Sequence, residues 1–283
     1  MTFADPVSVT ARFTAAARAR ESARPDRLFE DPWAAALAGA EGVAFMNRIA
    51  EAARVPGGPD LRDNPYIAIR TRMLDDFLLQ AVAEREARQV VILAAGLDTR
   101  AFRLTWPEGT RLYEQDHADV LSAKQATMDA AGAVARCERR TIAVDLSRPW
   151  TPPLEAAGFQ RGRRSVWLVE GLFPYLDEAG VGAVLTACSA LATAGSRLAC
   201  DLVGSTFLQS PWTRAHLDAM AREGAPWRFG TDAPEELFAA AGWDATALRP
   251  GDPGASFGRW PLPVYPRNTP GLPQTFVVFA SRR

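Results

Sequence analysis

Apolar residues recur along this chain in two patterns, and together they predict alternating strands and helices. Short apolar runs without polar alternation, at residues 90–93 and 166–169, are typical of strands that helices cover on both faces. Longer segments space their apolar residues as helices do, most clearly at 66–85, where Pro65 opens the helix. Because the two signals alternate up to residue 203, we expect an α/β fold with a mostly parallel sheet.

The remaining elements are predicted from the same patterns and from Pro, Gly and Asp signals. Further strands are expected at 111–116, up to 144–146, at 197–203, at 243–248 and finally at 275–280. Further helices are expected at 9–23, from Pro32 behind the N-cap Asp31, at 117–131, before Gly158, at 178–193 behind Asp177, and at 234–241. Segments 55–59 and 250–273 are rich in Pro and Gly and are predicted to be loops.

The alternation of predicted strands and helices stops after residue 203, and this change divides the chain into parts. A length of 283 residues suits one α/β core with added segments. We expect an N-terminal helical lid segment at 1–64 and a ligand-binding core at 65–203 and 231–283. Residues 204–230 are predicted to be an inserted helical cap over the carboxyl edge of the sheet.

Composition and charge narrow the class of protein. The formal net charge is −1, so the sequence predicts neither a nucleic-acid nor a membrane partner. It has no run long and apolar enough to span a membrane and no signal segment, so we expect a cytoplasmic protein. The 3 cysteines and 2 histidines are widely spaced, which argues against a metal site. Lys124 is the only lysine, which we attribute to a GC-rich coding bias.

Acidic residues follow four of the predicted strands: Asp98, Asp116, Asp145 and Glu170. In an open α/β sheet, ligands bind beyond the carboxyl ends of the strands. Asp116 comes twenty residues after Gly96, the spacing at which an acid can bond the two hydroxyls of a ribose. Any one of these acids could equally be a helix cap or a solvated loop residue, but the four together favour a nucleotide site.

The turn after the first strand indicates which nucleotide binds. Ala94, Ala95 and Gly96 let a ligand approach the backbone, but two glycines of the dinucleotide motif are missing. Asp98 would also repel a pyrophosphate. S-adenosyl-L-methionine suits the turn better because it has adenine and ribose, no phosphate, and a cationic sulfonium and ammonium. Its carboxylate could pair with Arg70, Arg72 or Arg18.

Several sequence blocks carry a more specific resemblance. The segment 92–104, ILAAGLDTRAFRL, resembles the glycine loop of the leucine carboxyl methyltransferase-like family of S-adenosylmethionine-dependent enzymes. Blocks in matching order are AAARA at 15–19, FEDP at 29–32, IRTR at 69–72, YEQD at 113–116, VDL at 144–146 and EGLFPYL at 170–176. Over residues 8–203 they are similar to the actinobacterial-type branch, whereas residues 204–270 match poorly, so acceptor specificity is expected there.

The resemblance implies a fold and a set of roles. The fold would be the Rossmann-like sheet of class I methyltransferases with an antiparallel last strand. Cofactor-binding residues would be Arg70 and Arg18 at the carboxylate, Ala94 and Gly96 at the methionine, Asp116 at the ribose, Asp145 and Leu146 at the adenine, and Glu170 at the amino-acid end. Asp98 and His117 are expected beside the cofactor. Ala94 departs from the family, where many members have glycine, yet its methyl is small enough to allow binding.

The expected reaction is an in-line methyl transfer, in which alignment and exclusion of water matter most. A carboxylate acceptor needs no base, whereas a hydroxyl does. Tyr175 and His216 are the candidate catalytic residues, although packing for Tyr175 and a solvent-facing position for His216 are alternatives. The scarcity of bases favours a carboxyl acceptor and a methyl ester. Four further aromatics suggest an aromatic small molecule, unless they pack the cap: Trp212, Trp227, Trp260 and Tyr265.

The function predicted from the sequence is therefore an S-adenosylmethionine-dependent O-methyltransferase. Its expected acceptor is a small molecule, such as one of secondary metabolism, or the carboxyl terminus of a peptide. An NAD-dependent oxidoreductase on a similar sheet and a non-catalytic S-adenosylmethionine-binding protein are the alternatives. The chain is expected to act as a monomer or a homodimer.

Overall fold

The computed structural model describes residues 6–52, 64–84, 87–267 and 269–283. The chain begins with the helices α1 (Pro6–Ser22), α2 (Ala34–Ala52) and α3 (Tyr66–Glu84). It continues with β1 (Gln89–Leu93), α4 (Arg100–Arg103), β2 (Arg111–Asp116), α5 (Ala118–Ala130), β3 (Glu138–Ala143), α6 (Thr151–Ala156) and β4 (Ser165–Val169). After the 3-10 turn η2 (Phe173–Tyr175) come α7 (Glu178–Leu191), β5 (Arg197–Val203), α8 (Ser205–Gln209), α9 (Arg214–Arg222), α10 (Pro234–Ala240), β6 (Trp243–Leu248) and β7 (Thr275–Arg282).

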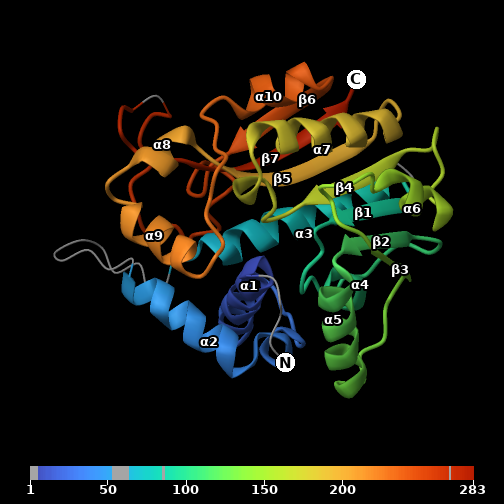
Figure 1. Cartoon of the computed structure of the whole chain (residues 1–283), viewed down its shortest axis with the longest axis horizontal. Helices are drawn as coiled ribbons and strands as arrows, with labels where there is room; N and C mark the ends of the chain where they lie inside the picture. Colours follow the sequence, from blue (N-terminus) through green and yellow to red (C-terminus); the bar gives the residue numbers. More distant parts are fainter. Residues whose placement is uncertain (1–5, 53–63, 85–86, 268) are drawn as a thin grey trace.

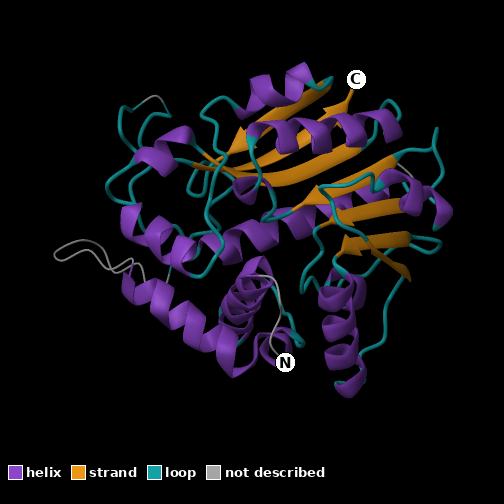
Figure 2. Ribbon diagram, viewed as in Figure 1, coloured by secondary structure: helices purple, strands orange, loops and turns teal. Residues whose placement is uncertain are grey.

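Within the described ranges, the strands form one sheet in the order β3-β2-β1-β4-β5-β7-β6. Neighbouring strands from β3 to β5 are parallel, whereas β7 is antiparallel to both β5 and β6. Figure 2 shows helices on both faces of this sheet. The predicted α/β class, with a mostly parallel sheet and an antiparallel last strand, is confirmed.

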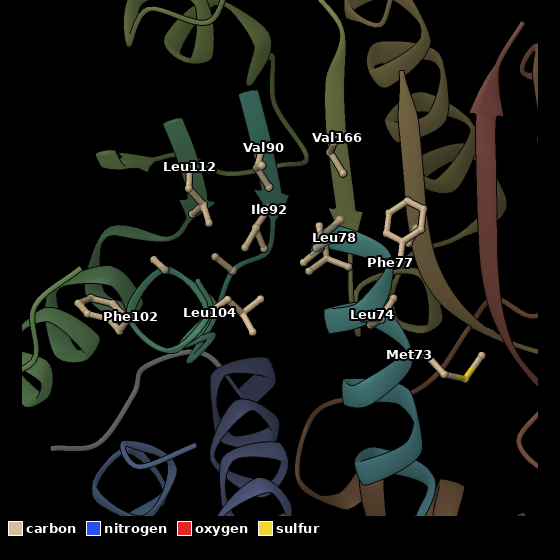
Figure 3. Close-up of a cluster of buried hydrophobic side chains, with 14 of the residues drawn as sticks. Met73, Leu74, Phe77, Leu78, Val90, Ile92, Phe102, Leu104, Leu112 and Val166 are labelled. Atoms are coloured by element: carbon tan, nitrogen blue, oxygen red, sulfur yellow. The ribbon is translucent and has the colours of Figure 1, made fainter. Parts of the chain in front are cut away.

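The central strands β1 and β4 are buried along their whole length because helices pack against both faces of the sheet there. Val90 and Ile92 of β1 lie in the core beneath α3, whereas Val91 and Leu93 lie in the core beneath α7 and α10. Figure 1 shows α3 on the opposite side of the sheet from α7 and α10. Figure 3 shows the α3 side of this core, where side chains of the helix meet those of the strands: Met73, Leu74, Phe77, Leu78, Val90, Ile92, Leu112 and Val166.

The predicted strands at 111–116, 197–203 and 243–248 have the bounds of β2, β5 and β6. The third strand was placed too far along the chain: β3 ends at Ala143, because Asp145 turns the chain by accepting hydrogen bonds from the N–H and hydroxyl of Ser147. The second helix starts at Ala34 and not at Pro32. The predicted loop at 55–59 lies outside the described residues.

The N-terminal helices and the segment after β5 pack around the carboxyl edge of the sheet. A Cβ on Gly42 would lie 2.6 Å from the Arg12 carbonyl oxygen, so this glycine allows close contact between α1 and α2. A small apolar cluster of α2 and α9 includes Phe45, Ile49 and Met220. Cys188 and Cys200 are buried and free, as expected of small core residues. Among the described helices, none has the length and apolar character that a membrane span requires.

Candidate functional site

The turn after β1 is bound tightly to the end of β2. The Gly96 N–H donates to Asp116 Oδ2 at 2.6 Å, and the Ala95 N–H donates to the Gln115 carbonyl at 3.0 Å. Gly96 has a φ of 46°, which glycine adopts at little cost. Ala94 has a φ of 50°, a left-handed conformation that costs a residue with a Cβ about 1 kcal/mol. The departure from glycine at Ala94 therefore strains the backbone of this turn.

Asp116 is the last residue of β2 and lies in the middle of this edge. Its second oxygen, Oδ1, accepts the N–H of His117 at 2.7 Å. Burial raises the pKa of Asp116, and the two backbone N–H donors oppose that rise. His117 is exposed and forms the N-cap of α5 beside the carboxylate. Asp116 is thus held by the backbone at the point where the sequence predicted a ribose-binding acid.

Asp145 and Leu146 follow β3, the strand beside β2. The Val144 N–H donates to the Asp116 carbonyl at 2.9 Å, which places this segment next to Asp116. Hydrogen bonds from Ser147 hold the pKa of the Asp145 carboxyl below its ordinary value. Asp145 and Leu146 are both half-buried. The two residues that the resemblance assigned to adenine therefore border the residue assigned to ribose.

Arg70 is a buried guanidinium between two carboxylates, Glu170 directly after β4 and Asp201 inside β5. Its Nη1 donates to Asp201 Oδ2 at 2.6 Å. Its Nε lies 2.9 Å from Glu170 Oε1, but the N–H does not point at that oxygen and finds no hydrogen-bond acceptor among the described residues. A buried donor without an acceptor is uncommon in folded proteins. Arg70 thus keeps one buried N–H donor without a hydrogen-bond acceptor among the described residues.

Arg100 connects three acids that come from three separate elements. Its guanidinium pairs with Asp75 of α3 at 2.7 Å, with Glu170 at 2.6 Å, and with Asp98 of the turn. Burial would raise the pKa of Asp98, but the charges of Arg100, Lys124 and Arg103 and the Arg100 N–H together outweigh burial and bring the pKa to about 2. Burial likewise opposes ionisation of Glu170, and Arg100 and Arg70 together lower its pKa. Asp98 and Glu170 are therefore ionised near neutral pH.

Asp98 also has the capping role that its position indicates. Its Oδ1 accepts the Arg100 N–H at 2.6 Å, at the start of α4. Arg103 of the same helix donates to Asp75 at 2.7 Å. Through Asp31, which pairs with both Arg103 and Arg18, the connected cluster contains four cations and five anions: Arg18, Arg70, Arg100, Arg103, Asp31, Asp75, Asp98, Glu170 and Asp201. Its excess charge is therefore negative.

Arg18 holds α1 against the turn. Its Nη2 donates to the Leu97 carbonyl at 2.7 Å, and its Nε donates to Asp31 Oδ2 at 2.9 Å. Asp31 is buried and also accepts the Thr99 hydroxyl at 2.7 Å. Burial would raise the pKa of Asp31, but Arg18 and Arg103 lower it. Asp31 thus joins α1 to the turn, and its Oδ1 also accepts the Trp33 N–H in the turn before α2, so it is not the residue directly before the helix that was expected.

Tyr175 and His216 meet through the rings of the segment after β5. Trp227 lies edge-on to Tyr175, with 6.3 Å between ring centroids, and 5.1 Å from the ring of His216. Phe207 packs against both Trp227 and His216. His216 Nε2 is buried and has no hydrogen-bond partner in the described structure. The expectation that His216 faces solvent is wrong, because its ring packs among these aromatics.

The four other aromatic residues proposed for an acceptor pocket lie in different environments. Trp227 belongs to the cluster around Tyr175, and Trp260 packs against the main core. Trp212 and Tyr265 are 66% and 48% exposed, so neither packs the segment onto the sheet. Trp227 is thus the tryptophan that accompanies the candidate catalytic residues.

Burial of His216 has a consequence for stability at acid pH. Burial holds the pKa of His216 at about 4, below its ordinary 6.5. The stability that depends on a neutral ring is complete above the unfolded pKa and is lost as the pH falls toward the folded pKa. Between about pH 7 and about pH 4.5, we expect the free energy of unfolding to fall by about 2 kcal/mol more in the wild type than in His216→Asn. Urea unfolding at the two pH values measures this difference, and parallel losses in both proteins would contradict it.

Four residues of the charged cluster were not predicted: Asp75, Arg100, Arg103 and Asp201. Asp201 lies inside β5, and the signal was an acid in the middle of an otherwise apolar strand. Arg100 follows the turn and was noted only as part of a sequence block. No group of His, Cys, Asp and Glu side chains in the described part of the chain could hold a metal.

Comparisons with known proteins agree with this architecture. The family model of leucine carboxyl methyltransferase matches residues 11–189. A protein of Frankia alni, provisionally assigned as an S-adenosyl-L-methionine-dependent methyltransferase, is 45% identical over 71% of this chain and 71% of its own. A protein of Saccharopolyspora erythraea with the same assignment is 38% identical over 89% and 88%. The crystal structure of a provisionally assigned methyltransferase from Thermobifida fusca has a TM-score of 0.63 over 96% and 94%, at 16% identity, and supports the fold.

Proposed function

The chain belongs to the leucine carboxyl methyltransferase family, its cofactor is S-adenosyl-L-methionine, and we propose that it methylates an oxygen atom of a small molecule. The preferred acceptor is a carboxylate, which would become a methyl ester, and a hydroxyl is the second choice. The carboxyl terminus of a peptide is a further acceptor of the same chemistry. A cytoplasmic monomer or homodimer remains our expectation.

The charge of the site carries the proposal. The cluster around Arg70 and Arg100 has one more anion than cations, which favours a cationic ligand and opposes a pyrophosphate. At the same time, Arg70 keeps a buried donor for one carboxylate. A ligand that is cationic and bears one carboxylate satisfies both conditions, and S-adenosyl-L-methionine is such a ligand. NAD, the alternative cofactor, does not satisfy the charge condition, because it carries a pyrophosphate.

We assign the cofactor-binding roles as follows. Asp116 accepts hydrogen bonds from the ribose hydroxyls, and Asp145 with the Leu146 backbone contacts the adenine edge. Ala94 and Gly96 border the methionine chain, and Arg70 holds its carboxylate. Glu170 faces the ammonium, while Asp98 adds negative charge nearby and His117 covers the ribose. Arg18 supports the site indirectly, because its hydrogen bonds to Asp31 and to the Leu97 carbonyl hold α1 against the turn.

The bound cofactor supplies a methyl group on a sulfonium, which is already a good leaving group. The protein residues then orient the acceptor and exclude water. Tyr175 and Trp227 form an aromatic wall for the acceptor beside α1 and η2. His216 Nε2 can accept a proton from a hydroxyl, but its pKa of about 4 makes it a weak base at neutral pH. A weak base suits an acceptor that is already ionised, which is why a carboxylate is preferred.

Two measurements test the function. Titration calorimetry should detect binding of S-adenosyl-L-methionine to the purified chain, with no comparable binding of NADH. Mass spectrometry should then detect methyl transfer to at least one member of a panel of aromatic and aliphatic carboxylic acids and phenols. Tight NADH binding would favour the oxidoreductase alternative. Cofactor binding without transfer to any of these acceptors would favour a non-catalytic binding protein.

A further inference from the structure

Asp201 uses both of its carboxylate oxygens to hold parts of the candidate site. It lies in β5 and is 5% exposed. Its Oδ2 accepts Arg70 Nη1 at 2.6 Å, and the Tyr66 hydroxyl lies 3.4 Å from the same oxygen. Its Oδ1 accepts the N–H of Gly171 at 2.6 Å. One side chain therefore connects α3 to the loop that follows β4.

The hydrogen bond from the Gly171 N–H to Asp201 also affects the position of the neighbouring acid, Glu170. Gly171 follows Glu170 directly and has a φ of 67°, so the chain turns sharply at this point. Since Asp201 fixes the Gly171 N–H, it also sets the direction in which Glu170 leaves β4. The two groups assigned to the cofactor's amino-acid end, Arg70 and Glu170, are thus both oriented by Asp201.

The two acids beside Arg70 are not equivalent. Asp201 accepts a well-aligned bond from Nη1, whereas Glu170 lies close to Nε without accepting a hydrogen bond from it. Glu170 is also paired with Arg100 at 2.6 Å, so its charge is balanced without Arg70. The contact with Asp201 fixes the guanidinium, and the contact with Glu170 can be exchanged for a ligand.

We propose that Asp201 is the positioning residue for recognition of the cofactor's amino-acid end. It locks Arg70 through Nη1, so that the buried Nε–H stays available for a carboxylate. Without Asp201, Arg70 would turn to Glu170, its remaining acid, and the free donor would be lost. The inference rests on the proposed role of Arg70, and it assigns a function to a residue that does not itself touch the cofactor.

The test compares two ligands that differ only in the part Asp201 is proposed to control. S-adenosyl-L-methionine carries the amino-acid group, and 5′-methylthioadenosine has the same adenosine without it. In Asp201→Asn we expect affinity for S-adenosyl-L-methionine to fall about 30-fold, as for loss of a charge-assisted hydrogen bond, with 5′-methylthioadenosine affinity within about twofold of wild type. Calorimetry measures both affinities, and thermal melting establishes that the variant is folded.

Two further variants separate positioning from packing. Glu114→Gln breaks another buried pair, with Lys124 on α5, and should leave the ratio of the two affinities unchanged. In an Arg70→Met background, Asp201→Asn should lower the affinity for S-adenosyl-L-methionine by less than a further factor of about three, because Asp201 acts through Arg70. If Asp201→Asn does not fold, Asp201→Ser takes its place with the same expected result.

The outcomes are distinct. An equal loss for both ligands, or a loss below about twofold for S-adenosyl-L-methionine, would overturn the role of Asp201. The role of Asp201 would also be overturned if Asp201→Asn lowered the affinity by the same factor in the Arg70→Met background as in the wild type. Failure of the wild type to bind either ligand would instead contradict the proposed function, so the two proposals can fail separately.

Discussion

Arg100→Met is expected to lower the free energy of unfolding by about 3–5 kcal/mol, as for removal of one partner from a buried ion pair. The guanidinium is buried and pairs with Asp75, Asp98 and Glu170. Methionine fills a similar volume but leaves these acids facing one another with one cation fewer. The penalty is therefore the cost of uncompensated buried charge and not the loss of packing.

Urea unfolding at neutral pH measures this change. Arg161→Met is the matched control, because Arg161 also pairs with a carboxylate, Glu155, but both side chains are solvent-accessible. Exposed pairs contribute little to stability, so the control should unfold at the wild-type urea concentration. If Arg100→Met and Arg161→Met unfolded together, the cluster would not be the stabilising feature that its geometry indicates.

Asp116→Ala is expected to weaken binding of S-adenosyl-L-methionine by at least about 100-fold. Two charge-assisted hydrogen bonds to ribose hydroxyls would be lost, each contributing about 1.5–3 kcal/mol. The Gly96 N–H would also lose its acceptor, so the turn that borders the cofactor would no longer be fixed to β2. Both effects act on adenosine recognition, unlike the effect of Asp201.

Calorimetry with S-adenosyl-L-methionine and with 5′-methylthioadenosine measures the loss, which should be similar for the two ligands. Asp119→Ala is the control, since Asp119 is an exposed acid in the first turn of α5, three residues away. Affinity within about threefold of wild type in Asp116→Ala would place the ribose elsewhere.

The sequence predicted best what depends on local chemistry. β2, β5 and β6 were placed correctly, because apolar runs between turn residues determine strand positions. Asp177 caps α7 as predicted, since capping involves only neighbouring residues. Asp116 lies beside Gly96, because the end of β2 and the turn that follows β1 are adjacent at the carboxyl edge of the sheet.

Contacts between distant segments were not predictable in the same way. Asp201 and Arg70 are separated by 131 residues, and no local pattern indicates that they meet. Arg18 was expected at the cofactor, and its contacts with Asp31 and with the Leu97 carbonyl, 79 residues away, were not indicated by any local pattern. The environment of His216 depends on Phe207 and Trp227, which come together only when the segment after β5 folds.

Lys124 gives the folded protein an unusual chemical surface. It is the only lysine of the sequence, its side chain is fully buried, and its Nζ donates to Glu114 at 2.8 Å. The folded chain therefore exposes no side-chain amine, and its basic surface groups are guanidinium groups. An acylating reagent can reach this amine only when α5 separates from the sheet. The rate at which Lys124 is acylated thus measures how often this part of the protein opens, without background from other lysines.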